Sequence, residues 1–391
     1  MAEASPHGQS RVGRALLIAS ALLLASCGAV VPRTAPPRPS PPPPPVAAAP
    51  VPADALPEDR ERHRVALLVP LSGPNAAVGE SIANAATLAL ADTGGKAVRI
   101  TTYDTAGGAA LAAQKALADG NRLFLGPLLG EDVRAVAASA SAAGVPVIAF
   151  SNDAAAASDR VWLLGFTPAQ SIDRVVRYAK GRGLLRFAGL VPAGTYGRNA
   201  SNTLLRAAEA AGGQVVAMQS YQRSPAAIAA AVTALSRQKF DAVLVADSGR
   251  VAVQAMAALR KRGVTARLLG TELWNAEPGL NASPAMAGAW FASVDDARFA
   301  QLSQRYRVRY GRAPYRLASL GYDAVLLTIR IAGDWKPGAA FPVDRLADEG
   351  GFAGVDGAFR FGGGHVAERA LAVHQVGPGG AKTVSAAPTG F

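Results

Sequence analysis

Three carboxylates stand at or just after short apolar runs and are the residues with the clearest potential for chemistry. Asp104, Asp153 and Glu272 could converge as paired carboxylates, which serve acid–base catalysis or hold a cationic group. Other catalytic signatures are missing from the sequence. There is no Gly-x-Ser-x-Gly elbow, no phosphate-binding Gly-x-x-x-x-Gly-Lys-Ser/Thr loop, and no pair of histidines at metal-binding spacing. We therefore expect a protein that is not an enzyme and that uses no cofactor or metal.

The single cysteine, Cys27, ends a stretch typical of a secretion signal. Arg11 and Arg14 precede the apolar run ALLIASALLLAS, which is shorter than the about 20 residues that a membrane-spanning helix needs. We expect residues 1–26 to be a signal peptide. The run ends in LASC, which resembles the bacterial lipobox, and the resemblance implies that Cys27 is acylated and becomes the mature N-terminus. An ordinary secreted protein with a spare cysteine is the alternative.

This interpretation places the protein in the periplasm, attached to a membrane through lipid alone. Gly28 follows the cysteine where the inner-membrane retention signal of enteric lipoproteins has aspartate, which favours the outer membrane over the inner one. One cysteine also excludes an intramolecular disulfide and a cysteine-based zinc site.

Residues 27–63 are expected to form a disordered, proline-rich tether. The stretch VPRTAPPRPSPPPPPVAAAPVPADALP has no hydrophobic periodicity and cannot bury a core. As polyproline II it would reach about 80 Å. The alternative is a leader that only clears the membrane surface.

The formal net charge of +12 raises the question of an anionic partner. The densest basic segment, RYRVRYGRAPYR at 305–316, predicts the end of a helix in which Tyr306 stacks on Tyr310, with Gly311 and Pro314 after it. Without a recognition motif, no nucleic-acid partner is expected.

From Arg64 onward, short apolar runs alternate with alanine-rich amphipathic stretches. Runs such as RVALLVP, RLFLG and FDAVLVAD predict buried strands, and the stretches between them predict helices that end on glycine. Two successive series of this kind predict an α/β protein with two doubly wound parallel sheets. The glycine-rich end, GVDGAFRFGGGHVAERALAVHQVG, predicts a terminal hairpin.

The loop LGPLLGEDV at 125–133 lies where open α/β proteins hold small ligands, between the end of a strand and the start of a helix. It offers Leu128, Leu129 and Gly130 and no hydroxyl group. The loop therefore has the position of a binding site without the usual polar side chains.

The order of these segments resembles the type I periplasmic-binding fold, in particular the leucine/isoleucine/valine-binding receptor family. The resemblance runs from about Arg64 to Val376 and rests on seven segments in order: PLSGPNAAVGE, YDTAGGAALAAQKAL, LGPLLGEDV, TYGRNA, LLGTELW, RYGRAPYRLASLGYDAVLL and GVDGAFRF…LAVHQV. It implies two lobes joined by three crossovers, near Phe166, Phe291 and Gly333. The expected lobes are residues 64–166 plus 291–333 and residues 167–290 plus 334–379, with a flexible tail at 380–391.

In that family an amino acid is held between the lobes, its carboxylate by hydroxyl and backbone N–H groups and its ammonium by an acidic and a tyrosine side chain. The resemblance places Gly130 and Val78 where the family has a hydroxyl and an aromatic residue, whereas Tyr196 and Glu272 match the ammonium-binding types. Branched amino acids are therefore not expected as ligands. Alternatively, Tyr196 and Glu272 only cap and pack local turns. The candidate cleft residues are Ser72, Gly130, Glu131, Ser151, Asn152, Asp153, Tyr196 and Glu272.

Two functions are compatible with this resemblance. The lipobox, the tether and the altered cleft resemble the lipoprotein activators of class A penicillin-binding proteins, of alphaproteobacterial type, which stimulate peptidoglycan synthesis by direct contact. The alternative is a solute-binding receptor that delivers amino acids or another small ligand to the permease of an ABC importer. Ligand-induced stabilisation would favour the receptor, and capture of a penicillin-binding protein would favour the activator.

Overall fold

The structure is a computed structural model that describes residues 61–277 and 279–388. The predicted signal peptide, the predicted lipidation site Cys27 and nearly all of the predicted tether lie outside the described residues. Within the described ranges, no helix is long and apolar enough to cross a membrane.

The first large sheet has five parallel strands in the order β2-β1-β3-β4-β5. Strand β1, which lies between β2 and β3, is almost entirely buried, as its apolar sequence predicts. Alternate β1 side chains face two cores: Val65 and Leu67 pack against α1 and α9, whereas Ala66 and Leu68 pack against α2 and α3. The elements are β1 (His63–Val69), α1 (Ala76–Asp92), β2 (Val98–Asp104), α2 (Ala109–Ala118), β3 (Leu123–Leu125), α3 (Gly130–Ala142), β4 (Val147–Ala149), η1 (Ala154–Ala156), β5 (Val161–Leu163) and α9 (Ala318–Ala332).

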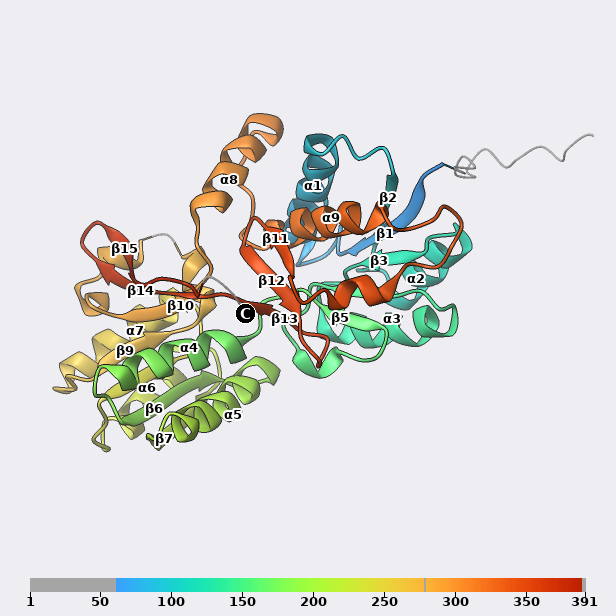
Figure 1. Cartoon of the computed structure of the whole chain (residues 1–391). Coiled ribbons are helices and arrows are strands. Elements are labelled where there is room, and N and C mark those ends of the chain that lie inside the picture. The colour runs from blue at the N-terminus through green and yellow to red at the C-terminus, as the bar shows by residue number, and fades with distance from the viewer. Residues whose placement is uncertain (1–60, 278, 389–391) are drawn as a thin grey trace, which may run out of the picture. The chain divides into compact units, whose positions relative to one another are not determined.

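The second large sheet has the order β15-β14-β10-β9-β8-β6-β7, with β6 to β10 parallel and β14 and β15 antiparallel. Helices α4 and α5 cover one face, and α6 and α7 cover the other (Figure 1). The elements are α4 (Pro168–Gly181), β6 (Arg186–Pro192), α5 (Thr195–Ala210), β7 (Gln214–Tyr221), α6 (Pro225–Leu235), β8 (Ala242–Val245), α7 (Gly249–Lys261), β9 (Arg267–Gly270), η2 (Glu272–Ala276), η3 (Leu280–Ala282), η4 (Pro284–Met286), β10 (Trp290–Ser293), β14 (Ala372–Gly377) and β15 (Gly380–Ser385).

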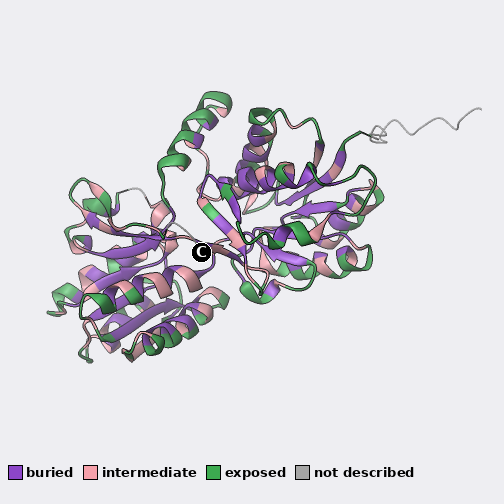
Figure 2. Ribbon diagram, in the orientation of Figure 1, coloured by how far each residue is buried: buried purple, intermediate pink, exposed green. Residues whose placement is uncertain are grey.

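The strands of both large sheets are mostly buried, and the outward faces of the covering helices are exposed (Figure 2). Parallel strands that helices cover on both faces are buried on both faces, and for this reason their sequences are continuously apolar. The observed burial therefore confirms the predicted α/β class with two doubly wound sheets.

A third, small sheet joins the first lobe. It consists of β11 (Phe352–Gly354), β12 (Gly357–Phe361) and β13 (Ala367–Arg369), and it follows α8 (Ala297–Tyr310), α9 and η5 (Val343–Ala347) along the chain. Its phenylalanines share one core with β1, α1 and α9. Within α8, Tyr306 and Tyr310 pack with ring centroids 4.6 Å apart, and Gly311 caps the helix in the left-handed conformation, both as predicted.

Two lobe boundaries differ from the sequence prediction. Strand β10 is hydrogen-bonded to β9 and β14 of the second sheet, so the chain leaves the second lobe after Ser293. This agrees with a crossover near Phe291 but extends the second lobe beyond its expected end at residue 290. The prediction of a crossover near Gly333 was wrong. Residues 334–369 stay with the first lobe because Phe352 and Phe359 pack against its core, and the chain returns to the second sheet only after Arg369.

Both ends of the folded body were also placed wrongly. His63 belongs to β1 rather than to the tether, since its buried ring stacks on Trp335 with centroids 4.0 Å apart. The expected flexible tail contains β15, whose backbone pairs with β14. Instead of the single predicted terminal hairpin, the chain forms antiparallel pairs β11–β12 and β12–β13 in the small sheet and β14–β15 in the second large sheet.

Candidate ligand-binding site

A cavity of about 460 Å³ lies between the ends of the two large sheets. Its wall includes residues that follow parallel strands: Phe150 after β4, Glu272 after β9 and Val294 after β10. Phe166 and Thr167, on the first link between the lobes, also line it. The carboxyl ends of parallel strands are where open α/β folds bind their ligands, so the cavity occupies the expected position.

One side of the cavity is apolar. Val78 from α1, Leu128 and Leu129 from the loop before α3, and Phe150 contribute to this wall, as does Leu317 from the segment before α9. The leucines of the GPLLGED loop therefore take part in the cavity as hydrophobic surface. This wall can accommodate a hydrocarbon or aromatic group but cannot hydrogen-bond through its side chains.

Asn152 is the predicted first-lobe residue that lines the cavity. Ser72 does not line the cavity. Its hydroxyl instead donates a hydrogen bond to Asp104 Oδ2 at 2.7 Å. Asp104 also accepts from the backbone N–H groups of Leu71 and Ala106, and these bonds hold the pKa of its carboxyl below the usual value. Ser72 and Asp104 thus connect and stabilise the two loops that follow β1 and β2.

The remaining first-lobe candidates, Gly130, Glu131, Ser151 and Asp153, do not line the cavity. Asp153 accepts from Arg134 at 2.8 Å and from the backbone N–H of Ala155 at 3.2 Å, and its own N–H donates to Ser151 Oγ at 3.1 Å. Gly130 starts α3 directly beside this cluster, and Glu131 lies exposed in the first turn of the helix. These side chains order the loops and leave no carboxylate of the first lobe in the wall.

On the second lobe, Glu272 lines the cavity but is already engaged. The hydroxyl of Tyr196 donates to Glu272 Oε1 at 2.9 Å, and the hydroxyl of Ser171 donates to Oε2. Burial raises the pKa of Glu272. Burial and the adjacent Glu272 raise the pKa of Tyr196, which also contacts Thr271 and is not part of the wall. Ser171, on α4, was not predicted from the sequence.

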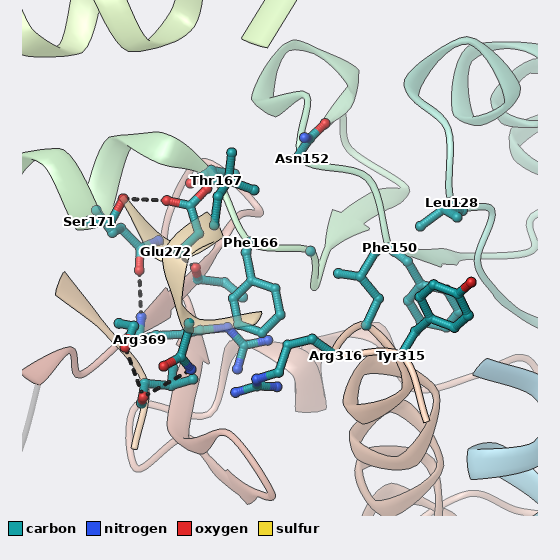
Figure 3. A pocket seen from close by; sticks show the side chains of 18 of the residues that line it. Leu128, Phe150, Asn152, Phe166, Thr167, Ser171, Glu272, Tyr315, Arg316 and Arg369 are labelled. Carbon is teal, nitrogen blue, oxygen red and sulfur yellow. Dashed lines mark hydrogen bonds between the residues drawn. The ribbon is translucent and has the colours of Figure 1, made fainter. Parts of the chain in front are cut away.

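Two arginines that sequence reasoning missed as site residues line the cavity: Arg316 before α9 and Arg369 at the end of β13. Both guanidinium groups lie against the ring of Phe166, with centroid distances of 5.7 Å and 4.7 Å (Figure 3). Arg369 also donates to the backbone carbonyl of Leu164 at 2.7 Å. Arg316 stood in the segment interpreted as a helix end, and Arg369 lies in a short strand with no motif around it.

Behind the arginines are two buried aspartates. Asp356 lies 2.7 Å from Arg316 Nη1, and Asp323 accepts backbone N–H bonds from Val355 and Asp356 at 2.6 and 3.3 Å. Burial and the neighbouring Asp356 raise the pKa of Asp323 to about 7, despite the opposing effect of Arg369. In the described ranges, no group of three or more His, Cys, Asp or Glu side chains could hold a metal ion.

The raised pKa of Asp323 predicts a pH-dependent loss of stability. Between its unfolded value of 3.8 and about 7, the folded state binds more protons than the unfolded state, so the free energy of unfolding falls as pH rises through this window. Asp323→Asn should remove this part of the fall. Urea unfolding at several pH values measures the difference between the two proteins, with exposed Asp159→Asn as a control. Parallel curves for wild type and Asp323→Asn would contradict the assignment.

The chain was compared with known proteins. The family described as periplasmic binding protein matches residues 63–381. A curated relative, an uncharacterised protein of Rickettsia prowazekii, is 25% identical over 181 residues, which cover 46% of this chain and 48% of the relative. The chain thus spans about half the length of this relative.

Solved structures with the same fold cover most of the described chain. A leucine-binding protein of Thermotoga maritima has a TM-score of 0.65 at 19% identity, covering 84% of this chain and 99% of that one. A solute-binding protein of Rhodopseudomonas palustris BisB5, solved with 3,4-dihydroxybenzoic acid, has 0.67 at 21% identity, covering 84% and 97%. A branched-chain amino acid transporter's substrate-binding protein from Streptococcus pneumoniae, solved with isoleucine, has 0.64 at 20% identity, covering 83% and 99%.

At these identities the solved structures establish the fold. The family match extends from the first strand to β15 and includes both lobes and the cavity between them. This chain belongs to the periplasmic binding protein family.

Proposed function

We propose that this protein is a non-catalytic solute-binding receptor that delivers a small molecule to the permease of an ABC importer. The observation that supports this proposal best is the cavity of about 460 Å³, which lies at the carboxyl ends of the strands of both sheets. Small-molecule sites typically have volumes of about 300–1,000 Å³, apolar walls and a few convergent polar groups. The cavity has an apolar wall on the first lobe and polar groups on the links and the second lobe.

The comparisons favour the same function over direct activation of a synthase. The leucine, isoleucine and 3,4-dihydroxybenzoic acid proteins are binding proteins for compounds of this size. An exchangeable ligand should therefore stabilise the folded chain. In a screen of small periplasmic solutes, we expect a cognate compound to raise the melting temperature by about 5 °C at about 100 times its Kd. A chain that no small solute stabilises would contradict the receptor function.

We further propose that the receptor is a periplasmic lipoprotein attached through Cys27. Replacing Cys27 by alanine removes the acylated thiol, and diacylation supplies the two chains that stable anchoring requires. Cys27→Ala should leave the membrane fraction, whereas Ser40→Ala, a matched change in the proline-rich segment, should remain there. Fractionation of cells that express each variant measures this. Retention of Cys27→Ala in the membrane pellet would exclude the lipid anchor.

Activation of a class A penicillin-binding protein is kept as the second candidate. It is supported by the first-lobe loops, in which Asp153 and Ser151 form bonds with neighbouring residues and do not line the cavity, so that these side chains cannot hold a solute. The purified full chain should then accelerate glycan polymerisation by such a synthase. An unchanged polymerisation rate, together with capture of a permease complex, would exclude this function.

A further inference from the structure

The charged residues of the cavity wall differ in how many of their hydrogen-bonding atoms already have a partner within the protein. Within the part of the chain that the structure describes, the wall contains one acidic side chain, Glu272, and two basic ones, Arg316 and Arg369. Asn152, Ser171 and other neutral polar groups complete it. The kind of ligand therefore depends on which of these charges still lacks a partner.

Glu272 is poorly suited to binding an ammonium group. Each of its oxygens already accepts a hydroxyl hydrogen, from Tyr196 and from Ser171. Burial raises the pKa of its carboxyl, against the opposing effect of these two hydroxyl groups. An incoming ammonium group would have to compete with the hydroxyl groups of Tyr196 and Ser171 for these oxygens, so an amino group on the ligand gains little here.

Arg369 has donors without acceptors. The residue is only 8% exposed, and its Nη2 donates to Leu164, but no described residue accepts a hydrogen bond from its Nε or Nη1. Arg316 Nε and Nη2 likewise lack hydrogen bonds in the described chain, although Nη2 lies 3.4 Å from Asp296 Oδ1. Each buried donor without an acceptor costs about 1–3 kcal/mol. An acceptor from outside the chain would remove this cost.

The arrangement also decides how a ligand would lie. Figure 3 shows Leu128, Phe150 and Tyr315 on one side of the cavity and Arg369 on the other. The ring of Phe166 covers both guanidinium groups. A shift of Phe166 would open their free N–H groups to the cavity, and the planar fork of a guanidinium matches a carboxylate in two parallel hydrogen bonds.

The charge of this cluster leaves room for an anion. Asp356 neutralises Arg316, with an N–O distance of 2.7 Å, whereas Asp323 already accepts two backbone N–H groups and is readily protonated. Asp296 is half-exposed and therefore screened by water. Asp356 and Asp323 also attract the guanidinium of Arg369, so the two arginines share these carboxylates, and a net positive charge remains in the cluster when Asp323 is protonated.

We propose that the cavity binds an apolar monocarboxylic acid without an ammonium group, its carboxylate on Arg369 and Arg316 and its hydrocarbon or aromatic part against the Val78, Leu128 and Phe150 wall. The inference rests on the proposed receptor function and specifies its ligand class. It differs from an amino-acid site in the groups that bind the ligand. Two arginines bind the carboxylate in place of the hydroxyl-bearing loop, and no acidic side chain binds an ammonium group.

Calorimetric titration of the full chain with matched probes tests the proposal. 4-Methylpentanoate and leucine differ by the ammonium group alone, and benzoate and benzamide differ by the charged carboxylate. Benzoate should bind about 10- to 100-fold more tightly than benzamide, the range expected for the loss of charge-assisted hydrogen bonds. 4-Methylpentanoate should bind more tightly than leucine by about the same factor, because the ammonium group of leucine would be desolvated against the apolar wall. Tighter binding of leucine than of 4-methylpentanoate would overturn the ligand class while leaving the receptor function intact. If no compound in a broad solute library binds, both fail.

Substitution of the arginines separates ligand binding from a structural role. Arg369→Gln and Arg316→Gln should each reduce the acid-to-amide affinity ratio about tenfold or more, because the charged donors are lost. Arg134→Gln, which breaks an ion pair outside the cavity wall, is the matched control and should preserve the ratio. If the Arg369→Gln variant does not fold, the acid-to-amide affinity ratio of the Arg316→Gln variant alone decides between ligand binding and a structural role. Lower stability with an unchanged ratio would assign the arginines to a purely structural ion cluster and overturn the proposal.

Discussion

Gly197→Ala is expected to lower the free energy of unfolding by about 3 kcal/mol or more. A β-carbon at Gly197 would lie 1.6 Å from the carbonyl oxygen of Pro192, the residue that ends β6. The atom in the way belongs to the backbone, so no side-chain rotation can relieve the overlap. Helix α5 would have to move away from the sheet that it covers. The first lobe repeats this contact, where a β-carbon at Gly79 of α1 would lie 1.8 Å from the carbonyl oxygen of Pro70.

The measurement is urea unfolding of the wild type and the variant, monitored by circular dichroism. Gly181→Ala is the matched control, because Gly181 ends α4 and a β-carbon there meets nothing within 4 Å. The control should be neutral or stabilising by about 0.5–1 kcal/mol, since alanine has the better helix propensity. A Gly197→Ala protein as stable as the control would refute the close approach of α5 to β6.

Trp274→Ala is expected to cost about 3–5 kcal/mol, the range for removing a fully buried large aromatic side chain. Trp274 is 1% exposed and its indole N–H donates to the carbonyl of Asp247 at 3.0 Å. Its ring occupies the space above Gly270, where a β-carbon would lie 2.3 Å from the indole. The same short helix η2 begins with Glu272, so Trp274 also fixes the second-lobe part of the cavity wall.

Trp274→Phe separates the two contributions of this residue. The smaller ring keeps most of the buried apolar surface but loses the N–H donor, so the variant should be destabilised by about 1–3 kcal/mol. Denaturant unfolding gives both values on one scale. Equal stability of the alanine variant and the wild type would mean that Trp274 does not anchor the Glu272 segment.

The α/β class could be predicted because strands buried on both faces are locally recognisable. Runs such as those of β1 and β8 are continuously apolar, and the helices between them end on glycine, so local sequence and tertiary structure agree. The third lobe boundary, which lies after Arg369 and not near Gly333, could not be found in this way. The side chains of Phe352 and Phe359 decide it by packing against a core formed far earlier in the chain.

The residues of the candidate site likewise fall into those that could be predicted from the sequence and those that could not. The family resemblance put Asn152 and Glu272 among the candidate cleft residues, and both line the cavity, because the sheet topology brings their loops together. The partners of Glu272 and Asp153 depend on distances that no pattern encodes. Arg369 enters the site through a crossover that the sequence prediction had placed elsewhere, and it therefore escaped notice.

The central claim, that the cavity between the lobes holds one small organic acid, is tested most directly by native mass spectrometry of the full chain isolated from its own cell envelope. The account predicts one small molecule per chain, released on denaturation, detected as a negative ion, and displaced by excess benzoate or 4-methylpentanoate but not by leucine. A chain without any bound molecule, whose mass stays unchanged after incubation with either acid, would contradict the account.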